Sequence, residues 1–169
     1  MIDSQNFRND YVGNNTTANY EYDFKIFDED HLLVTVRTAA GVEITLVKTT
    51  DYTVSNVGTE AGGTVTLVDG NQAWLDSITG FLDDDMELVL TRNVPLLQES
   101  DFANQEDFYP ETHEAQFDTL VMMIQQLQEE LRRCVKVSIA DYTSPLILPK
   151  VSARALQNFS FDANGLPTV

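Results

Sequence analysis

Two histidines and two short acidic runs are the residues that could carry acid–base or metal chemistry. His31 falls in a predicted strand and His113 in an early turn of a predicted helix, and their spacing matches neither a metal-binding motif nor a catalytic triad. The acidic runs occupy residues 28–30 and 83–85, and neither has the spaced ligands of an EF-hand calcium loop. Some clustering is expected by chance among 27 acidic residues. We therefore predict that both runs are solvated turns and that both histidines are ordinary surface or interface residues.

Two further features could bind phosphate or metal. The glycine-rich loop at residues 58–63 lacks the lysine and the strand-to-helix context of a phosphate-binding loop. Cys134 is the only cysteine, which excludes an intrachain disulfide and a cysteine-based zinc site. The sequence therefore predicts a protein that is not an enzyme and that has no cofactor, no metal site and no catalytic residues.

Aromatic residues leave one binding function open. Tyr52, Trp74, Phe81 and Tyr109 could stack on sugar rings, as in a glycan-binding module. Trp74 is the only tryptophan, however, and the apolar residues beside it indicate burial. We expect this turn-rich stretch to cap the core through Trp74, Leu75, Ile78, Phe81 and Leu82. An oligomeric glycan-binding β sandwich remains the alternative function.

Negative charge is concentrated in the first 131 residues. This part of the 169-residue chain carries 25 acidic against 5 basic residues, whereas residues 132–169 carry 2 against 5. An acidic body repels phosphate backbones, so we predict no nucleic-acid partner. A secretion signal is not recognisable at the start, and the apolar run at 120–124 is too short to span a bilayer, so no membrane partner is expected. The acidic body would suit a basic protein surface, and solubility alone is an equally good explanation.

Apolar and polar residues alternate in several short segments after residue 18, which is the pattern of half-buried strands. The expected strands are residues 20–27, 31–37, 42–49, 51–54, 63–68 and 86–92. The second and third should form a hairpin around a turn that ends in Gly41. With 43% hydrophobic residues the chain can build a core. We predict a mainly β fold, a small antiparallel β sandwich or barrel followed by one long α-helix and an extended C-terminal tail.

The chain divides into five predicted parts. They are a flexible N-terminal arm at 1–18, a β domain at 19–92, a linker at 93–109, an oligomerisation helix at 110–134 and an extended connector at 135–169. The helix should begin at Pro110 with an acidic first turn and end near two arginines, as the helix dipole favours.

The predicted helix carries an apolar seam with the heptad spacing of a coiled coil. The seam residues, spaced alternately by three and four, are Phe117, Leu120, Ile124, Leu127, Leu131 and Cys134. Val121 and Met123 widen the seam beyond a two-stranded stripe, which favours a bundle of three helices or packing against a sheet. We interpret the seam as a self-association surface because its period is 3.5 rather than 3.6. The alternative is that this face covers the chain's own β domain.

The order of these segments resembles the N-terminal anchor region of tail fibre and tailspike proteins from short-tailed bacteriophages. The matching pieces are YEYDFKIF, DYTV, GGTVTL, MELVLTRNVPL, SDF, the helix HEAQFDTLVMMIQQLQEELRR, RCVKV, LILP and ARALQNFSFDANGLP. The resemblance implies a homotrimer that docks on the ring proteins of the virion tail, such as an adaptor or nozzle. It also implies a distal receptor-binding or glycan-degrading region, or a second tailspike, beyond the anchor. The expected location is the virion, with assembly in the host cytoplasm.

Overall fold

The computed structural model describes residues 2, 4–68, 70, 72–98 and 109–136, and scattered residues after them. These later residues are 140, 148, 150–155, 158, 160, 161, 163, 167 and 168. The chain forms two compact units, Met1–Arg132 and Arg133–Val169. The first unit contains both the β domain and the long helix.

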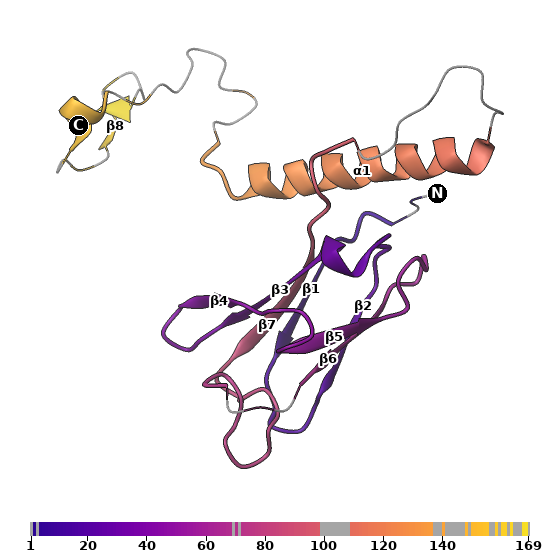
Figure 1. The fold of residues 1–169 in the computed structure, drawn as a ribbon. Coiled ribbons are helices and arrows are strands. Elements are labelled where there is room, and N and C mark those ends of the chain that lie inside the picture. The colour runs from indigo at the N-terminus through magenta and orange to yellow at the C-terminus, as the bar shows by residue number, and fades with distance from the viewer. Residues whose placement is uncertain are drawn as a thin grey trace. The chain divides into compact units, whose positions relative to one another are not determined.

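A β sandwich makes up most of the first unit (Figure 1). Its strands are β1 (Arg8–Val12), β2 (Asn19–Tyr22), β3 (Leu32–Arg37), β4 (Glu43–Thr45), β5 (Tyr52–Ser55), β6 (Gly63–Leu67) and β7 (Glu87–Arg92). One sheet has the order β1-β7-β3-β4 and the other the order β2-β6-β5, and all neighbouring strands are antiparallel. The predicted fold class is therefore confirmed, as a sandwich followed by one long helix.

The core forms because alternate side chains of both sheets point inward. In β3 the side chains of Leu32, Val34 and Val36 are buried, and their neighbours are partly or fully exposed. The predicted strand at 20–27 is shorter than expected and ends at Tyr22, but its alternation continues and buries Phe24 and Ile26 as well. Each of these large apolar side chains contributes about 1.5–3 kcal/mol of burial energy before ordering costs.

Strand β1 corrects the prediction of a flexible arm at residues 1–18. It pairs with β7 along its whole length, with Tyr11 opposite Leu88. The ring of Tyr11 also meets the ring of Tyr20 edge-on, with 5.2 Å between centroids. Because β1 is an edge strand with the sequence RNDYV, polar residues fall on both of its faces and no period is visible. A rule based on alternation therefore misses it.

Two other local predictions need correction. His31 is not in a strand but ends a 3-10 turn at Glu29–His31, and its side chain is buried rather than at the surface. In the loop between β6 and β7, Trp74, Leu75 and Leu82 join the core as predicted, but Ile78 is 91% exposed.

The long helix, α1 (Pro110–Arg132), lies across one end of the sandwich (Figure 1). The second unit contains α2 (Val151–Arg154) and an antiparallel pair of short strands, β8 (Ser160–Phe161) and β9 (Pro167–Thr168). The connector predicted at 135–169 therefore includes a helical turn and a hairpin and is not extended throughout. Residues 99–108 of the predicted linker and 141–147 of the predicted connector lie outside the described residues.

Candidate self-association surface on α1

Helix α1 contacts the β domain through polar side chains. Asp118 and Met122 are its two buried residues, and Met122 is fully buried. Gln125 and Gln126 follow on the same side of the helix, one turn further along. An amphipathic helix usually covers a domain with its apolar face. The face of α1 that packs on the β domain, here called the docked face, contains one large apolar side chain, Met122. Its other contacts are hydrogen bonds.

Asp118 forms the first of these polar contacts. Its carboxylate accepts a hydrogen bond from the backbone N–H of Ile2 at 3.0 Å and from Lys25 Nζ at 3.3 Å. Burial alone would raise the pKa of Asp118, but hydrogen bonds and charge from neighbouring cations, Lys25 among them, outweigh burial and hold the pKa below its ordinary value. Lys25 also pairs with Glu60, so the contact joins α1 to two loops of the domain.

Arg92, at the end of β7, forms the second polar contact. Its side chain is 2% exposed and donates hydrogen bonds to the side-chain oxygen of Gln125 and to the backbone oxygen of Lys25, the latter at 3.3 Å. The guanidinium also lies over the ring of Phe24, 5.8 Å from its centroid. Burial lowers the pKa of Arg92 to about 10. Even so, the side chain remains a cation at neutral pH, and its charge is stabilised by the dipoles of its hydrogen-bond acceptors and by the face of the Phe24 ring.

The two glutamines complete the docked face. Gln125 Nε2 donates to the backbone oxygen of Ser4 at 3.0 Å, and Gln126 Oε1 accepts from the backbone N–H of Val94 at 2.9 Å. Gln126 Nε2 reaches Asn93 Oδ1 at 3.5 Å. These bonds place the first residues of the chain and the segment after β7 against α1.

The apolar seam lies on the opposite side of α1 and is exposed. The exposed fractions are 67% for Phe117, 54% for Leu120, 40% for Val121, 63% for Ile124, 49% for Leu127 and 58% for Leu131. Met123 is partly buried. At 3.6 residues per turn, Met122 and Ile124 lie roughly 160° apart around the helix. The alternative in which the seam covers the chain's own β domain is therefore wrong.

Cys134, the last predicted seam residue, is not part of the helix. Helix α1 ends at Arg132, and Cys134 lies two residues beyond it with an exposed side chain. The last turn of a helix frays because its final carbonyl groups have no partner within the helix. The seam that the structure brings together therefore runs from Phe117 to Leu131.

A hollow of 370 Å³ adjoins one edge of the seam. Leu96, Leu97 and Gln98, which follow β7, form one wall. The α1 wall is made of His113, Gln116, Phe117, Thr119, Leu120 and Met123. Leu96 and Leu97 are 59% and 69% exposed, so the segment after β7 extends the apolar surface beyond the helix. Both leucines fall within the predicted linker at 93–109 and were not predicted to belong to the apolar face.

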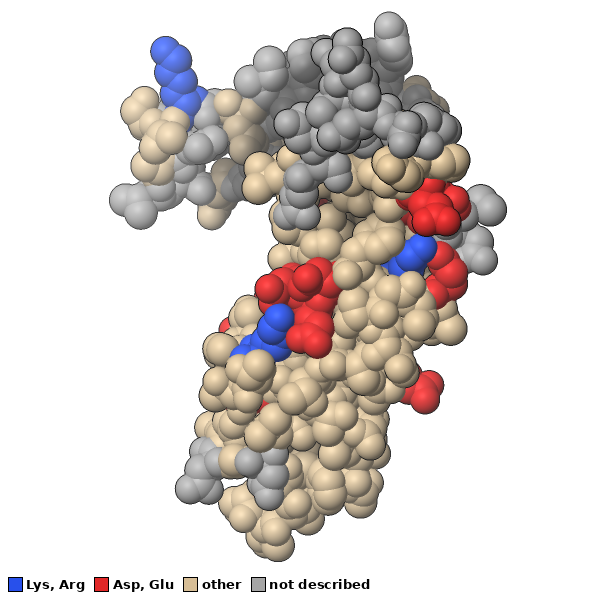
Figure 2. Space-filling view, turned by 45° about the vertical axis from the view of Figure 1, so that its right-hand side comes forward, with Lys and Arg blue, Asp and Glu red and all other residues tan. Residues whose placement is uncertain are grey.

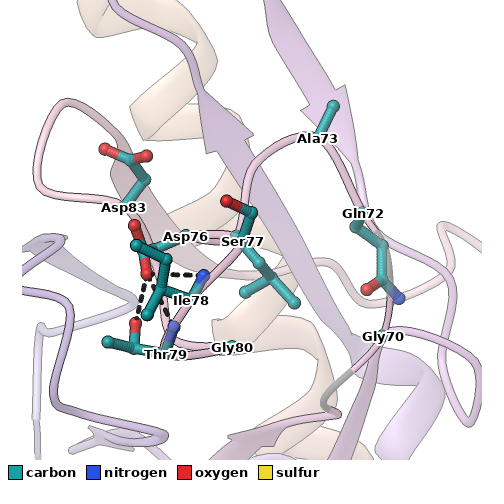
Figure 3. Close-up of a pocket in the computed structure, with 10 residues that line it drawn as sticks. Gly70, Gln72, Ala73, Asp76, Ser77, Ile78, Thr79, Gly80 and Asp83 are labelled. Carbon is teal, nitrogen blue, oxygen red and sulfur yellow. Dashed lines mark hydrogen bonds between the residues drawn. The ribbon is translucent and has the colours of Figure 1, made fainter.

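The loop between β6 and β7 forms a second candidate site at a polar hollow of 700 Å³, lined by Gln72, Ser77 and Gly80 among others. The carboxylate of Asp76 accepts hydrogen bonds from the backbone N–H groups of Ile78 and Thr79, which turns the chain and leaves Ile78 at the tip (Figure 3). These bonds lower the pKa of Asp76. They stabilise a turn and bring no reactive pair together.

The remaining candidates from the sequence lie in turns or in the core. The carboxylates of residues 83–85 come within 4.8 Å of one another in a partly exposed turn. Residues 28–30 are exposed, and the carboxylates of Glu29 and Asp30 lie beside Lys48. On the face shown in Figure 2, acidic side chains likewise gather beside basic ones. Tyr52 and Trp74 are each 4% exposed, so neither ring offers a face to a sugar.

The chain is similar in sequence to a known protein. No protein-family model matches the chain. Over 123 residues, 73% of its length, the chain is 35% identical to the tail spike protein of Salmonella phage epsilon15. This chain is related to the N-terminal domain of podovirus tail spikes. The resemblance predicted from the order of its segments is thereby confirmed.

The match covers a small part of the epsilon15 tail spike. The aligned region is 10% of that protein, so the activity and partners of the whole spike do not follow from it. The relationship supports a phage tail structural protein located in the virion tail. Among the described helices, none is long and apolar enough to cross a membrane.

Proposed function

We propose that the chain is a trimeric anchor or adaptor that attaches a tail fibre or tailspike to the phage tail. Its partners would be two further copies of itself, the ring proteins of the tail, such as an adaptor or nozzle, and a distal fibre region or second tailspike. Chains would assemble in the host cytoplasm and remain in the virion. The relationship to a phage tail spike supports the setting, and helix α1 supports the self-association.

The observation that carries the proposal is the orientation of α1. Its polar face is used for docking to the β domain, so the exposed apolar seam is available for another chain. The five large side chains of the seam from Phe117 to Leu131 are about half to two thirds exposed, so covering them could contribute roughly 4–9 kcal/mol of burial energy per copy before ordering costs. Left in water, this apolar face would be an aggregation liability.

Charge favours another copy of the same chain as the occupant of the seam. The chain has a net charge of −17, so copies repel each other wherever charged faces meet. Between residues 115 and 128 the sequence contains one charged residue, Asp118, and that side chain is turned toward the β domain. The outward face of this stretch therefore carries no charge. Acidic copies can meet there without repulsion, and cores of protein interfaces are depleted in charge in the same way.

The acidic surface of the β domain supports the proposed tail partner. Steering between an acidic domain and a basic docking site speeds encounter and helps to select the partner. The proposal therefore assigns two kinds of contact to two surfaces. The uncharged face of α1 would meet other copies, and the acidic sandwich would meet the tail.

The test is the mass of the purified chain by light scattering, which should correspond to three copies. Ile124→Asp should give a monomer, because a trimer would bury three unpaired carboxylates at considerable cost. Since Ile124 is 63% exposed in the single chain, the variant should keep its folded β domain by circular dichroism. Val47→Asp is the matched control, because Val47 is 59% exposed at a turn of the sandwich. It should remain a trimer.

Two results would overturn the proposal. A wild-type chain that is monomeric at micromolar concentration would remove the self-association. A monomer that binds to a glycan array would favour the alternative glycan-binding function. Of the four aromatic residues considered for sugar stacking, Phe81 and the 59%-exposed Tyr109 remain accessible.

A further inference from the structure

We propose that the trimer contact joins two unlike edges of the apolar face, so that the Val121 edge of α1 in one copy enters the hollow beside Leu97 in the next. This inference rests on the proposed trimeric function and deepens it. It assigns an occupant to the hollow, which is a second copy of this chain.

The two edges of the apolar face differ in structure. Val121 and Met123 are two residues apart, which places them roughly 160° apart around the helix. Met123 lines the hollow, where Leu96 and Leu97 form a wall beside the helix. Val121 does not line the hollow and is 40% exposed. One edge is therefore a recess and the other a free ridge.

Cyclic symmetry requires unlike edges to meet. In a ring of three, each contact is head-to-tail, so a surface on one copy touches a different surface on the next. A two-fold dimer would instead bring like edges together. If three α1 helices meet along a common axis, the Met123 edge of each faces the Val121 edge of its neighbour at a similar height. The recess and the ridge then face each other.

The chemistry of the hollow fits such an occupant. Phe117, Leu120 and Met123 provide an apolar floor, and Leu97, which is 69% exposed, would lose its contact with water when covered. The lining residues that follow β7 carry no formal charge. A charged peptide or a basic protein would find no complementary charge there. An uncharged helix edge of the same chain meets no repulsion.

The segment that forms the recess wall is held in place by α1 itself. The backbone N–H of Val94 donates to Gln126 Oε1 at 2.9 Å, and the side chain of Val94 is 2% exposed. The position of Leu96 and Leu97 beside the helix is thus fixed before another copy arrives. A preformed recess lowers the ordering cost of association.

Cysteine cross-linking distinguishes unlike edges from like edges. The double variant carries Leu97→Cys and Val121→Cys in a Cys134→Ser background. It is treated with a short bifunctional maleimide, which can join two cysteines that are too far apart for a disulfide. Each single-cysteine variant serves as a control. We expect the double variant to give a covalent ring of three chains on a denaturing gel and each single variant to give uncross-linked monomer. Both positions are exposed, so the substitutions should not disturb folding.

The outcomes separate the inference from the proposed function. Cross-linked dimers from either single variant would show that like edges meet and would overturn the inference. A trimer by light scattering without any cross-link in the double variant would overturn it too, while leaving the anchor function intact. A monomer by light scattering would overturn both.

Discussion

The guanidinium of Arg92 donates a hydrogen bond to the side-chain oxygen of Gln125, and this bond ties the end of β7 to the middle of α1. Arg92 is almost completely buried and has a dipole rather than a carboxylate as its partner at this point. The helix is therefore fixed in rotation on the domain. That rotation decides which of its faces is presented outward.

Loss of the Arg92 partner should destabilise the domain. Gln125→Ala is expected to lower the free energy of unfolding by about 1–3 kcal/mol, because a buried charged donor loses its acceptor. Gln128→Ala, at an exposed position of the same helix, should change it by less than about 0.5 kcal/mol. Urea denaturation measures the two changes in unfolding free energy. Both substitutions are made in the Ile124→Asp background, which is expected to be monomeric, so that assembly does not contribute. Equal losses for the two variants would contradict the assigned role of Gln125.

The ionisation of Asp118 should make stability depend on pH in the acid range. Its pKa is lowered in the folded chain, so its stabilising contribution is present above the unfolded pKa of about 4. That contribution is lost as the pH falls through the folded pKa. Asp118→Asn should be less stable than the wild type at pH 7, with a difference that shrinks toward pH 3. Asp84→Asn, at an exposed position in the loop between β6 and β7, is the control and should leave the pH profile unchanged.

Substitutions at two adjacent methionines should affect folding and assembly differently. Met122→Ala removes a fully buried side chain and should lower the free energy of unfolding by about 2–5 kcal/mol. Met123→Ala should have a smaller effect on folding and should weaken the trimer, because Met123 borders the seam. Denaturation of the monomeric background and light scattering across a dilution series measure the two effects. The division of the helix into two faces would be refuted if Met123→Ala unfolded the monomer and Met122→Ala did not.

A single added methyl group should disturb the end of the sandwich that holds the β6–β7 loop. A Cβ at Gly13 would lie 1.8 Å from the backbone oxygen of Asp83, so Gly13→Ala forces two backbones apart. The same turn is held by a hydrogen bond from the Gly13 N–H to the oxygen of Met86 at 2.8 Å. Gly41→Ala, at a positive φ but with open space around it, should cost only about 1–2 kcal/mol. Thermal unfolding should show the larger loss for Gly13→Ala.

Much of the sandwich was predictable because its strands alternate. The buried residues of β3 and of the segment 20–26 follow a period of two that any half-buried strand must show. Strand β1 was missed because an edge strand can carry polar residues on both faces. Arg92 was also missed, although a signal was present. It continues the inward-facing positions of Leu88 and Leu90 along β7, so the period of two already placed it on the core side.

The seam on α1 was predictable, and the docking of α1 was not. Heptad spacing identifies which residues share a face, but it does not say what covers that face. The docked face has the sequence signature of a solvated surface, since Asp118, Gln125 and Gln126 are polar. Only Met122 hints at burial. Pairing such a face with a buried arginine requires knowledge of the tertiary structure.

The polar docking of α1 also has a consequence for how this protein can evolve. Substitutions on the inner face of the helix are constrained by folding of the single chain, whereas under the proposed assembly substitutions on the outer face are constrained mainly by association with other copies. The two sets of residues interleave along the same 23-residue helix but lie on opposite faces of it. Under the proposed assembly, a lineage can therefore change its outer residues, and with them the copies it associates with, without rebuilding the domain beneath.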